Sequence, residues 1–279
     1  MRNKRICFIE VECINENGKK QLKRLQGLSI KGNVKRQAGN TQSEASLQIA
    51  NLDKKTVEYH TTYTTPYFNP QTKKKINIYA GYELTGWGRI FSGDITQAIP
   101  NGMPDNWLNI KAQSLYYANR TNLSYGANNI SVQELGKSIS GQLGLSFDWQ
   151  ATSQKTVDSF DFIGSKAELI KHYNQLDNIT MFEDNGVLRV VDKIQTPPQK
   201  GIKFISKKTG LIGEVEPDQY GIKLKCLIDA SLDCGKWIKT KSEKLPNTNG
   251  LYSIYTLDFD FATREQQFYC NIYAKAAKV

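Results

Sequence analysis

Apolar and polar residues alternate along a long stretch of the chain, from Ser43 to Ile99. Three runs carry this alternation, at residues 45–50, 76–80 and 90–96. Gly, Asn and Asp interrupt or end the runs, and period-two alternation with such breaks is typical of half-buried antiparallel strands. The stretch therefore predicts three strands of a small β-barrel or sandwich, and nothing in its pattern indicates catalysis.

Further strands are expected on both sides of this stretch. Alternation predicts strands at residues 6–14, 25–34 and 107–112, and Asn17-Gly18 is a typical β-hairpin turn. Residues 35–41 are polar and contain a glycine, so a loop is expected there. These elements predict a β domain for the first part of the chain.

A long connection runs from Asp53 to Lys75 and contains the aromatic residues Tyr63, Tyr67 and Phe68. Connections of this length in a compact domain are usually functional or contact a partner. Two interpretations stay open. The aromatic residues form an adhesive surface, or they pack back onto the domain.

The middle of the chain has the pattern of helices. Ser131 is followed three residues later by Glu134, and Ser165 by Glu168. This spacing is typical of a capping box, which satisfies the free N–H groups at the start of a helix. Apolar residues at helical spacing follow each serine. The elements expected here are helices over 131–143 and 165–176 and strands over 145–149, 160–162, 179–182 and 187–191.

Alternation returns after a linker at Thr196-Pro197-Pro198. Strands are expected at 202–205, 214–216, 220–227, 237–240, 251–258 and 268–274. The predicted fold class is therefore mainly β with α+β. Two small β-barrel-like domains, 1–118 and 196–279, flank a smaller α+β middle module, 119–195.

The net charge raises the question of partners. The 279 residues include 37 Lys and Arg against 27 Asp and Glu, a formal charge of +10. Such a charge is compatible with nucleic acid, an anionic surface or an acidic protein partner. The basic residues are spread along the chain, and the dense runs, Lys19 to Arg24 and Lys73 to Lys75, fall in expected turns. This distribution favours a solvated surface.

Cysteine and histidine usage argues against a zinc site. The five cysteines form no CxxC pair, and there are only two histidines. An odd number of cysteines without framework spacing indicates a reducing compartment. We expect no signal peptide and no membrane span, because glutamates break the first apolar run and no later run is long enough. The cysteines are Cys7, Cys13, Cys226, Cys234 and Cys270.

Candidate catalytic residues are few and isolated. Five aspartates could supply the paired carboxylates of a glycosidase, and Asp258 and Asp260 share one strand face. Carboxylates that face water at a strand end explain this pattern better. His60 and His172 have no neighbouring nucleophile motif. We therefore assign no catalytic, cofactor-binding or metal-ligating residue. The other three aspartates are Asp94, Asp229 and Asp233.

Two further patterns resemble binding motifs only in part. The glycine-rich segment from Gly81 to Gly88 lacks the lysine of a phosphate-binding loop, and a hairpin turn explains it better. Lys73 to Lys75 lie near Tyr67 and Phe68, a combination that can bind single-stranded nucleic acid. No diagnostic nucleic-acid motif accompanies them.

Several segments, taken in order, resemble phage tail and baseplate hub proteins, the late control protein D-like family of contractile tails. Ala45 to Leu52 ends in Asn-Leu, Ile76 to Tyr82 ends in Ala-Gly-Tyr, and Arg89 to Ile95 contains Phe-x-Gly-x-Ile, all as in the N-terminal domain of that family. Segments 209–213, 221–229 and 249–254 resemble its C-terminal barrel, and Asn185 to Leu188 resembles the end of its middle module.

This resemblance implies a structural protein and not an enzyme. Family hubs are homotrimers whose two similar β domains form a pseudo-sixfold ring, which adapts a sixfold tail tube to a threefold central spike. The implied partners are the spike protein and a tail tube or tube-initiator protein, with the tape measure protein as a further candidate. DNA would pass through the lumen without specific binding. The implied location is the virion tail baseplate, assembled in the bacterial host cytoplasm.

Two other functions stay open at this point. One is a tail-associated cell-wall hydrolase that would use Asp258 or Asp260. The chain shows no appended lysozyme-like or peptidase domain, so cell-wall cleavage of its own is not expected. The other is a basic nucleic-acid-binding module, which would bind DNA in a salt-sensitive manner.

Overall fold

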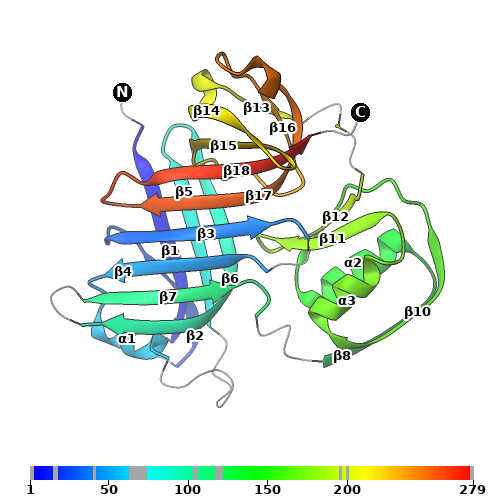
Figure 1. The fold of residues 1–279 in the computed structure, drawn as a ribbon. Coiled ribbons are helices and arrows are strands. Elements are labelled where there is room, and N and C mark those ends of the chain that lie inside the picture. The colour runs from blue at the N-terminus through cyan, green and yellow to red at the C-terminus, as the bar shows by residue number, and fades with distance from the viewer. Residues whose placement is uncertain are drawn as a thin grey trace.

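Strands dominate the computed structural model, which describes residues 3–14, 18–39, 42–62, 74–102, 106–116, 122–194, 197–198 and 201–276. Three α-helices accompany them in this part of the chain (Figure 1). The mainly β class with a smaller α+β part is confirmed. None of the described sheets closes into a barrel.

One sheet of thirteen strands forms the larger part of the molecule. Its strands come from the beginning and the end of the chain, and β13 and β16 extend it on one side of β17. The order is β14 (Leu211–Asp218), β15 (Gly221–Leu227), β18 (Phe268–Ala276), β17 (Gly250–Ala262), β3 (Ile30–Gln37), β4 (Glu44–Ala50), β7 (Trp107–Gln113), β6 (Gly86–Asn101), β5 (Lys75–Tyr82), β1 (Arg5–Ile14) and β2 (Lys20–Leu25), with β13 (Lys203–Ile205) and β16 (Trp237–Thr240) beside them.

The pairing of β3 with β17 joins the two ends of the chain. These antiparallel strands are in register from Lys31 opposite Ala262 to Gln37 opposite Thr256. Figure 1 shows the blue and orange strands side by side in the middle of the sheet. The N-terminal and C-terminal strand sets therefore share one continuous hydrogen-bonded surface.

The two ends of the chain also share a hydrophobic core, whereas the middle segment has a core of its own. One cluster of buried side chains runs from Cys7 to Ala274 and draws on both strand sets. Along β1, Ile9 and Val11 are fully buried while Glu10 and Glu12 lie on the opposite face, as period-two alternation predicts. Most of the middle segment packs around a second cluster of its own.

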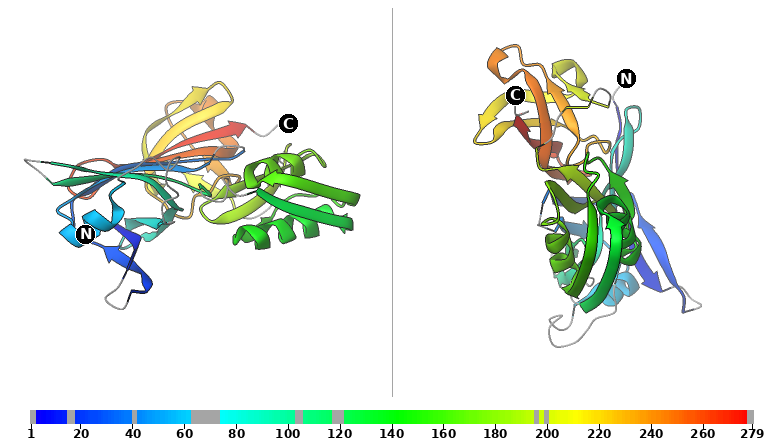
Figure 2. Two further views of the ribbon diagram at one scale, coloured as in Figure 1. Left: turned by 90° about the horizontal axis from the view of Figure 1, so that it is seen from below. Right: turned by 90° about the vertical axis from the view of Figure 1, so that its right-hand side faces the viewer.

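The middle segment consists of two small sheets with helices between them. A long two-stranded ribbon, β8–β10, lies on one side of α2 and α3, and a three-stranded sheet lies on the other (Figures 1 and 2). Its elements are β8 (Asn122–Ser131), α2 (Val132–Leu143), β9 (Ser146–Trp149), β10 (Thr156–Ser165), α3 (Lys166–Tyr173), β11 (Ile179–Asp184) and β12 (Val187–Asp192).

The two predicted capping boxes are confirmed. The Ser131 hydroxyl accepts the Glu134 N–H at 3.2 Å, and the Glu134 carboxylate accepts the Ser131 N–H at 3.4 Å. Ser165 and Glu168 form the same reciprocal pair at the start of α3. Helix α3, the second of the two predicted helices, ends at Tyr173, three residues before its predicted end at residue 176.

The connection after Asp53 is not all loop. Residues Lys54–His60 form α1, and the Asp53 side chain caps it by accepting the Thr56 N–H at 2.8 Å. The prediction was wrong there because this short helix lacks a strong apolar period. The aromatic residues 63, 67 and 68 and Lys73 lie outside the described residues.

Three other boundaries differ from the sequence prediction. The basic run up to Arg24 lies in strand β2 and not in a turn. Strand β3 begins at Ile30 and continues to Gln37, through residues expected in a loop. Strand β8, which has few β-branched residues, was not predicted at all. In each case pairing with a neighbouring strand outweighs weak local propensity.

Two further findings bear on compartment and membrane. All five cysteines are buried and carry free thiols. Among the described residues, no helix combines the length and the apolar character that a membrane crossing requires.

Candidate functional site

The five candidate aspartates do not form one site. Asp258 and Asp260 lie on the same face of β17 and both accept hydrogen bonds from the Asn33 amide, at 2.5 and 3.0 Å. Burial raises the pKa of Asp258, and the bond from Asn33 opposes this rise. Asp229 forms an ion pair with Lys203. These contacts tie the carboxylates of Asp258, Asp260 and Asp229 to neighbouring side chains of the fold.

Neither histidine has a catalytic neighbourhood. His60 is buried at the end of α1, and neither ring nitrogen has a hydrogen-bond partner among the described residues. Burial, helped by Lys74 and Lys23, lowers the pKa of His60 to about 4. His172 packs against the rings of Phe160 and Phe162 on the ribbon. Both side chains therefore have packing roles.

The glycine-rich segment is a hairpin between β5 and β6. Gly81 has φ +147°, and a Cβ atom there would lie 2.4 Å from the carbonyl oxygen of Gly86. A side chain would not fit. The glycines allow two strands to approach closely and do not form a phosphate-binding loop.

The described residues offer no metal site. Within the described ranges, His, Cys, Asp and Glu nowhere gather in a group of three or more that could hold a metal ion. The structure does bring several charged side chains together in one place, where they form ion pairs.

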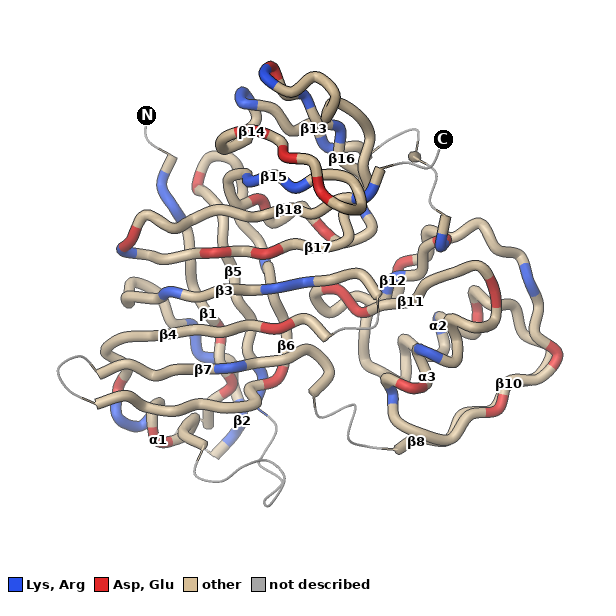
Figure 3. Tube along the Cα trace, viewed as in Figure 1, with Lys and Arg blue, Asp and Glu red and all other residues tan. Residues whose placement is uncertain are grey.

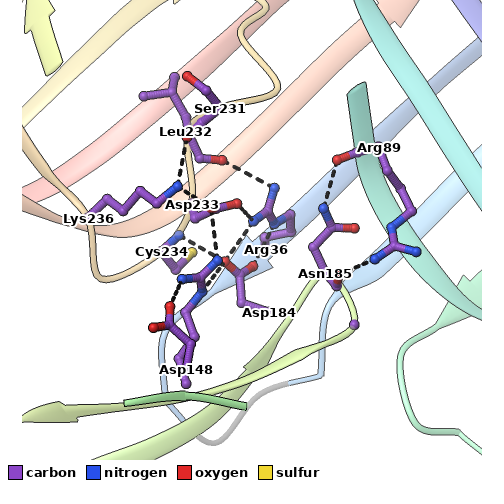
Figure 4. Close-up of polar contacts among 12 residues, drawn as sticks. Arg36, Arg89, Asp148, Asp184, Asn185, Ser231, Leu232, Asp233, Cys234 and Lys236 are labelled. Carbon is purple, nitrogen blue, oxygen red and sulfur yellow. Dashed lines mark hydrogen bonds and ion pairs between the residues drawn. The ribbon is translucent and has the colours of Figure 1, made fainter. Parts of the chain in front are cut away.

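A buried ionic junction lies where the three segments of the chain meet (Figure 4). Arg36 of β3 is fully buried, and its guanidinium binds both carboxylate oxygens of Asp184 at the end of β11, each at 2.6 Å. The same guanidinium donates to Asp233 at 2.7 Å, in the loop before β16. One side chain thus contacts all three segments.

A second arginine completes the junction from the middle segment. Arg189 of β12 binds Asp233 at 2.9 Å and Asp148 of β9, and Lys236 binds Asp233 at 2.6 Å. The Cys234 N–H donates to Asp184 at 3.0 Å. The junction contains three cations and three carboxylates, so the buried charges are balanced.

The ionisation states follow from this geometry. Burial acts to raise the pKa of Asp233, but Arg36, Lys236 and Arg189 together lower it below the usual value. The pKa of Arg36 is raised, because the attraction of Asp184 outweighs the burial that acts to lower it. Asp233 therefore stays ionised, and its carboxylate is occupied by bonds from Arg36, Arg189 and Lys236, so it is unsuited to act as a general base. The junction therefore holds the three segments of the chain together.

A second contact fixes the β11–β12 turn against the large sheet. Arg89 of β6 donates to the Asn185 carbonyl at 2.9 Å, and the Asn185 amide donates to the Arg89 carbonyl at 2.7 Å (Figure 4). Beside this turn, Glu183 is buried and accepts the Gly186 N–H at 2.7 Å. Burial raises the pKa of Glu183 to about 7, although bonds from Ser114 and Gly186 oppose the rise.

The sequence prediction missed the ionic junction. Arg36 was placed in a loop, yet it has the same parity as Ile30 and Val34, which are buried on the inner face of β3. An arginine on a buried face requires a carboxylate partner. The position of Arg36 on the buried face of the strand was the one sequence feature that could have indicated an ion pair. The neighbouring sequence did not identify the partners, Asp184 and Asp233, because they are 148 and 197 residues away.

Comparisons with known proteins agree with a structural role. The family model described as baseplate hub gp41 matches residues 9–274. No curated protein sequence matches the chain. Three solved structures share its fold over nearly the whole chain, at identities so low that they establish the fold alone.

The 43 kDa tail protein of prophage MuSo2 from Shewanella oneidensis has 8% identity and a TM-score of 0.60, over 97% of this chain and 98% of that one. A tail protein from Neisseria meningitidis MC58 has 7% identity and a TM-score of 0.62, over 96% of each chain. The E. coli c3393 protein, a component of the type VI secretion system, has 13% identity and a TM-score of 0.60, over 91% of this chain and 75% of its own.

The family match over residues 9–274 defines a class, the structural proteins of phage tail baseplates. Within that class, the chain belongs to the baseplate hub gp41 family. Membership implies a location in the phage tail baseplate. The resemblance to hub proteins that the sequence motifs indicated is confirmed.

Proposed function

We propose that this chain is a hub subunit of the baseplate of a phage or phage-like contractile injection machine. Three copies form a ring that adapts the sixfold tail tube to the threefold central spike. The protein acts by assembly and has no catalytic step. Its partners are the spike protein and the tube or tube-initiator protein.

The observation that carries this proposal is the family match over residues 9–274, taken together with the arrangement of the large sheet. That sheet places an N-terminal and a C-terminal strand set side by side in one subunit. Three subunits would therefore present six similar strand sets around a ring. Closed rings of identical subunits are common among oligomers.

The structural neighbours support a spike as partner. The E. coli c3393 protein is described as similar in structure to the T4 phage tail proteins gp27 and gp5. The division into domains 1–118, 119–195 and 196–279 belongs to the same proposal. The middle module would be an attachment on the ring formed by the other two.

The charge distribution fits passage of DNA better than capture of it. Basic and acidic residues are interspersed along the strands (Figure 3). Several lysines of the large sheet lie over tyrosine rings, as Lys225 does over Tyr269 at 4.3 Å. No single block of basic residues stands out on this view of the described chain. A cell-wall hydrolase has no specific observation in its favour.

The test is the mass of the purified protein in solution, alone and after mixing with the spike protein. We expect a trimer, or a monomer that forms a three-to-three complex with the spike. An unrelated trimeric protein of similar size serves as the mixing control. A monomer that ignores both spike and tube proteins would contradict the proposal.

A further inference from the structure

Most free strand edges in the described structure are protected against pairing with another chain. Natural sheets protect their edges with charged residues, prolines, short strands or covering groups. Strand β2 has three basic residues among six, β14 contains Pro217 and a register shift, and β13 and β9 have three and four residues. The end of β6 is covered by Thr62, whose hydroxyl accepts the Ala98 N–H at 2.9 Å.

The β8–β10 ribbon is less protected than these edges, since its only charged residues are Asp158 and Asp161 of β10. Each strand has ten residues, and the two are paired from Ser131 opposite Thr156 to Asn122 opposite Ser165. Neither contains proline, lysine or arginine. Apart from the helix caps at Ser131 and Ser165, no hydrogen bond from the described residues occupies the outer edge of either strand.

The ribbon has one covered face and one open face. Tyr125 and Phe160 are buried toward the helices of the module. Ile163 on the open face is 82% exposed, more than any other large apolar residue described. Figure 1 shows the ribbon at the end of the molecule farthest from the large sheet, where a neighbouring chain can reach it.

We propose that the outer edge of β10 in one copy pairs with the outer edge of β8 in the next copy. This inference rests on the trimeric ring proposed above and assigns part of its interface. Three ribbons joined in this way would form a closed β-structure around the threefold axis, so that no ribbon edge remains free.

Charge selects this pairing over its alternatives. Strand β10 carries Asp158 and Asp161, whereas β8 carries no charged residue. Pairing β10 with β10 would bring acidic residues together across the contact, which is unfavourable. Pairing β8 with β8 would form a dimer and leave both β10 edges open. Only the β10-to-β8 contact avoids repulsion and closes a ring.

A cross-linking experiment tests the contact directly. Ser124 of β8 and Ile163 of β10 are exposed register partners, and all five native cysteines are buried, so cysteines introduced at these positions are selectively reactive. Full-length chains with Ser124→Cys are produced together with chains carrying Ile163→Cys and treated with a short bifunctional maleimide. We expect cross-linked dimers in the mixture and none with either variant alone.

The matched control places the cysteines on an exposed helix surface of the same module. Gln133→Cys and Gln142→Cys chains, mixed in the same way, should give no cross-linked product. Cross-links with Ser124→Cys alone would indicate β8-to-β8 pairing and overturn the proposal. So would the absence of cross-links in a mixture that is trimeric by mass.

Hydrogen exchange provides a second measurement on the unmodified protein. Peptides covering 122–131 and 156–165 should exchange slowly in the trimer and at least tenfold faster after dilution to monomer. Fast exchange of these peptides in an intact trimer, with or without spike protein, would overturn the ribbon pairing and leave the trimeric hub standing. A wild-type protein that never forms a trimer would contradict both the ribbon pairing and the trimeric hub.

Discussion

Arg36 is the residue on which the arrangement of the three segments depends most directly. It is fully buried and bonds Asp184 and Asp233 at once. Removing one partner of a buried ion pair leaves uncompensated charge, which typically costs about 3–5 kcal/mol. We predict that Arg36→Met lowers the free energy of unfolding by about this amount in denaturant titrations.

The neighbouring residue supplies the control. Lys35→Met changes the same charge on the exposed face of the same strand and should shift stability by no more than about 0.5 kcal/mol. Adding Asp184→Asn to the Arg36→Met variant should recover part of the loss. An Arg36 variant as stable as the Lys35 variant would show that the junction contributes little.

Glu183 gives the molecule a defined pH dependence. Its carboxyl loses a proton near pH 4.5 in the unfolded chain and near pH 7 in the folded one. The folded state therefore binds the proton more tightly, and the contribution of Glu183 to stability falls as pH rises through this interval. We predict that Glu183→Gln stabilises the protein at pH 8, by up to about 3 kcal/mol, and much less at pH 5.

The measurement is the difference in melting temperature between variant and wild type at the two pH values. His60 contributes in the opposite direction, because its lowered pKa makes stability rise with pH between about 4 and 6.5. Since variant and wild type both contain His60, its contribution cancels when their melting temperatures are subtracted. Glu83→Gln, at an exposed position, should show no such change. Equal effects of Glu183→Gln at both pH values would contradict the assignment.

Single elements were predictable where local chemistry determines them. The serine–glutamate pairs identified α2 and α3, and alternation identified β4, β5 and β15. Strand β8 escaped prediction because its asparagines, glycine and serines have low strand propensity, and only its pairing with β10 holds it extended. The ionic junction escaped because its partners are far apart in sequence.

The capping box of α2 carries a measurable share of the stability of the middle segment. Ser131 satisfies the N–H group of Glu134, and replacing an N-cap serine with alanine typically costs about 1 kcal/mol. We predict that Ser131→Ala lowers stability by this amount, measured by chemical denaturation. Ser138→Ala, on the exposed middle of the same helix, should be neutral or slightly stabilising.

At the scale of the whole molecule, two hydrophobic cores predict two units of unfolding. The first is shared by both ends of the chain, and the second belongs to the middle segment. Leu135→Ala removes a fully buried side chain from the second core, at a typical cost of about 2–5 kcal/mol. We predict that hydrogen exchange then accelerates in peptides from 122–194 and stays unchanged in β17 and β18.

Ile49→Ala is the counterpart in the shared core. Ile49 is fully buried in β4, and its loss should accelerate exchange both in residues 3–116 and in residues 201–276, because the two ends pack around one core. If only the N-terminal peptides responded, the two ends would be separate folding units. The sequence alone predicted two separate β domains and could not show that they share a sheet.

The pairing of β3 with β17 also means that β3 must wait for its partner strand during translation. Asn33 contacts Asp258, which follows it by 225 residues. At a translation rate of roughly 5–20 residues per second, β3 leaves the ribosome roughly 10–45 s before its partner strand exists. During that interval one of its edges is open to nascent chains on the same messenger RNA. Crowded polysomes should therefore favour misassembly, and slower initiation should raise the yield of native protein.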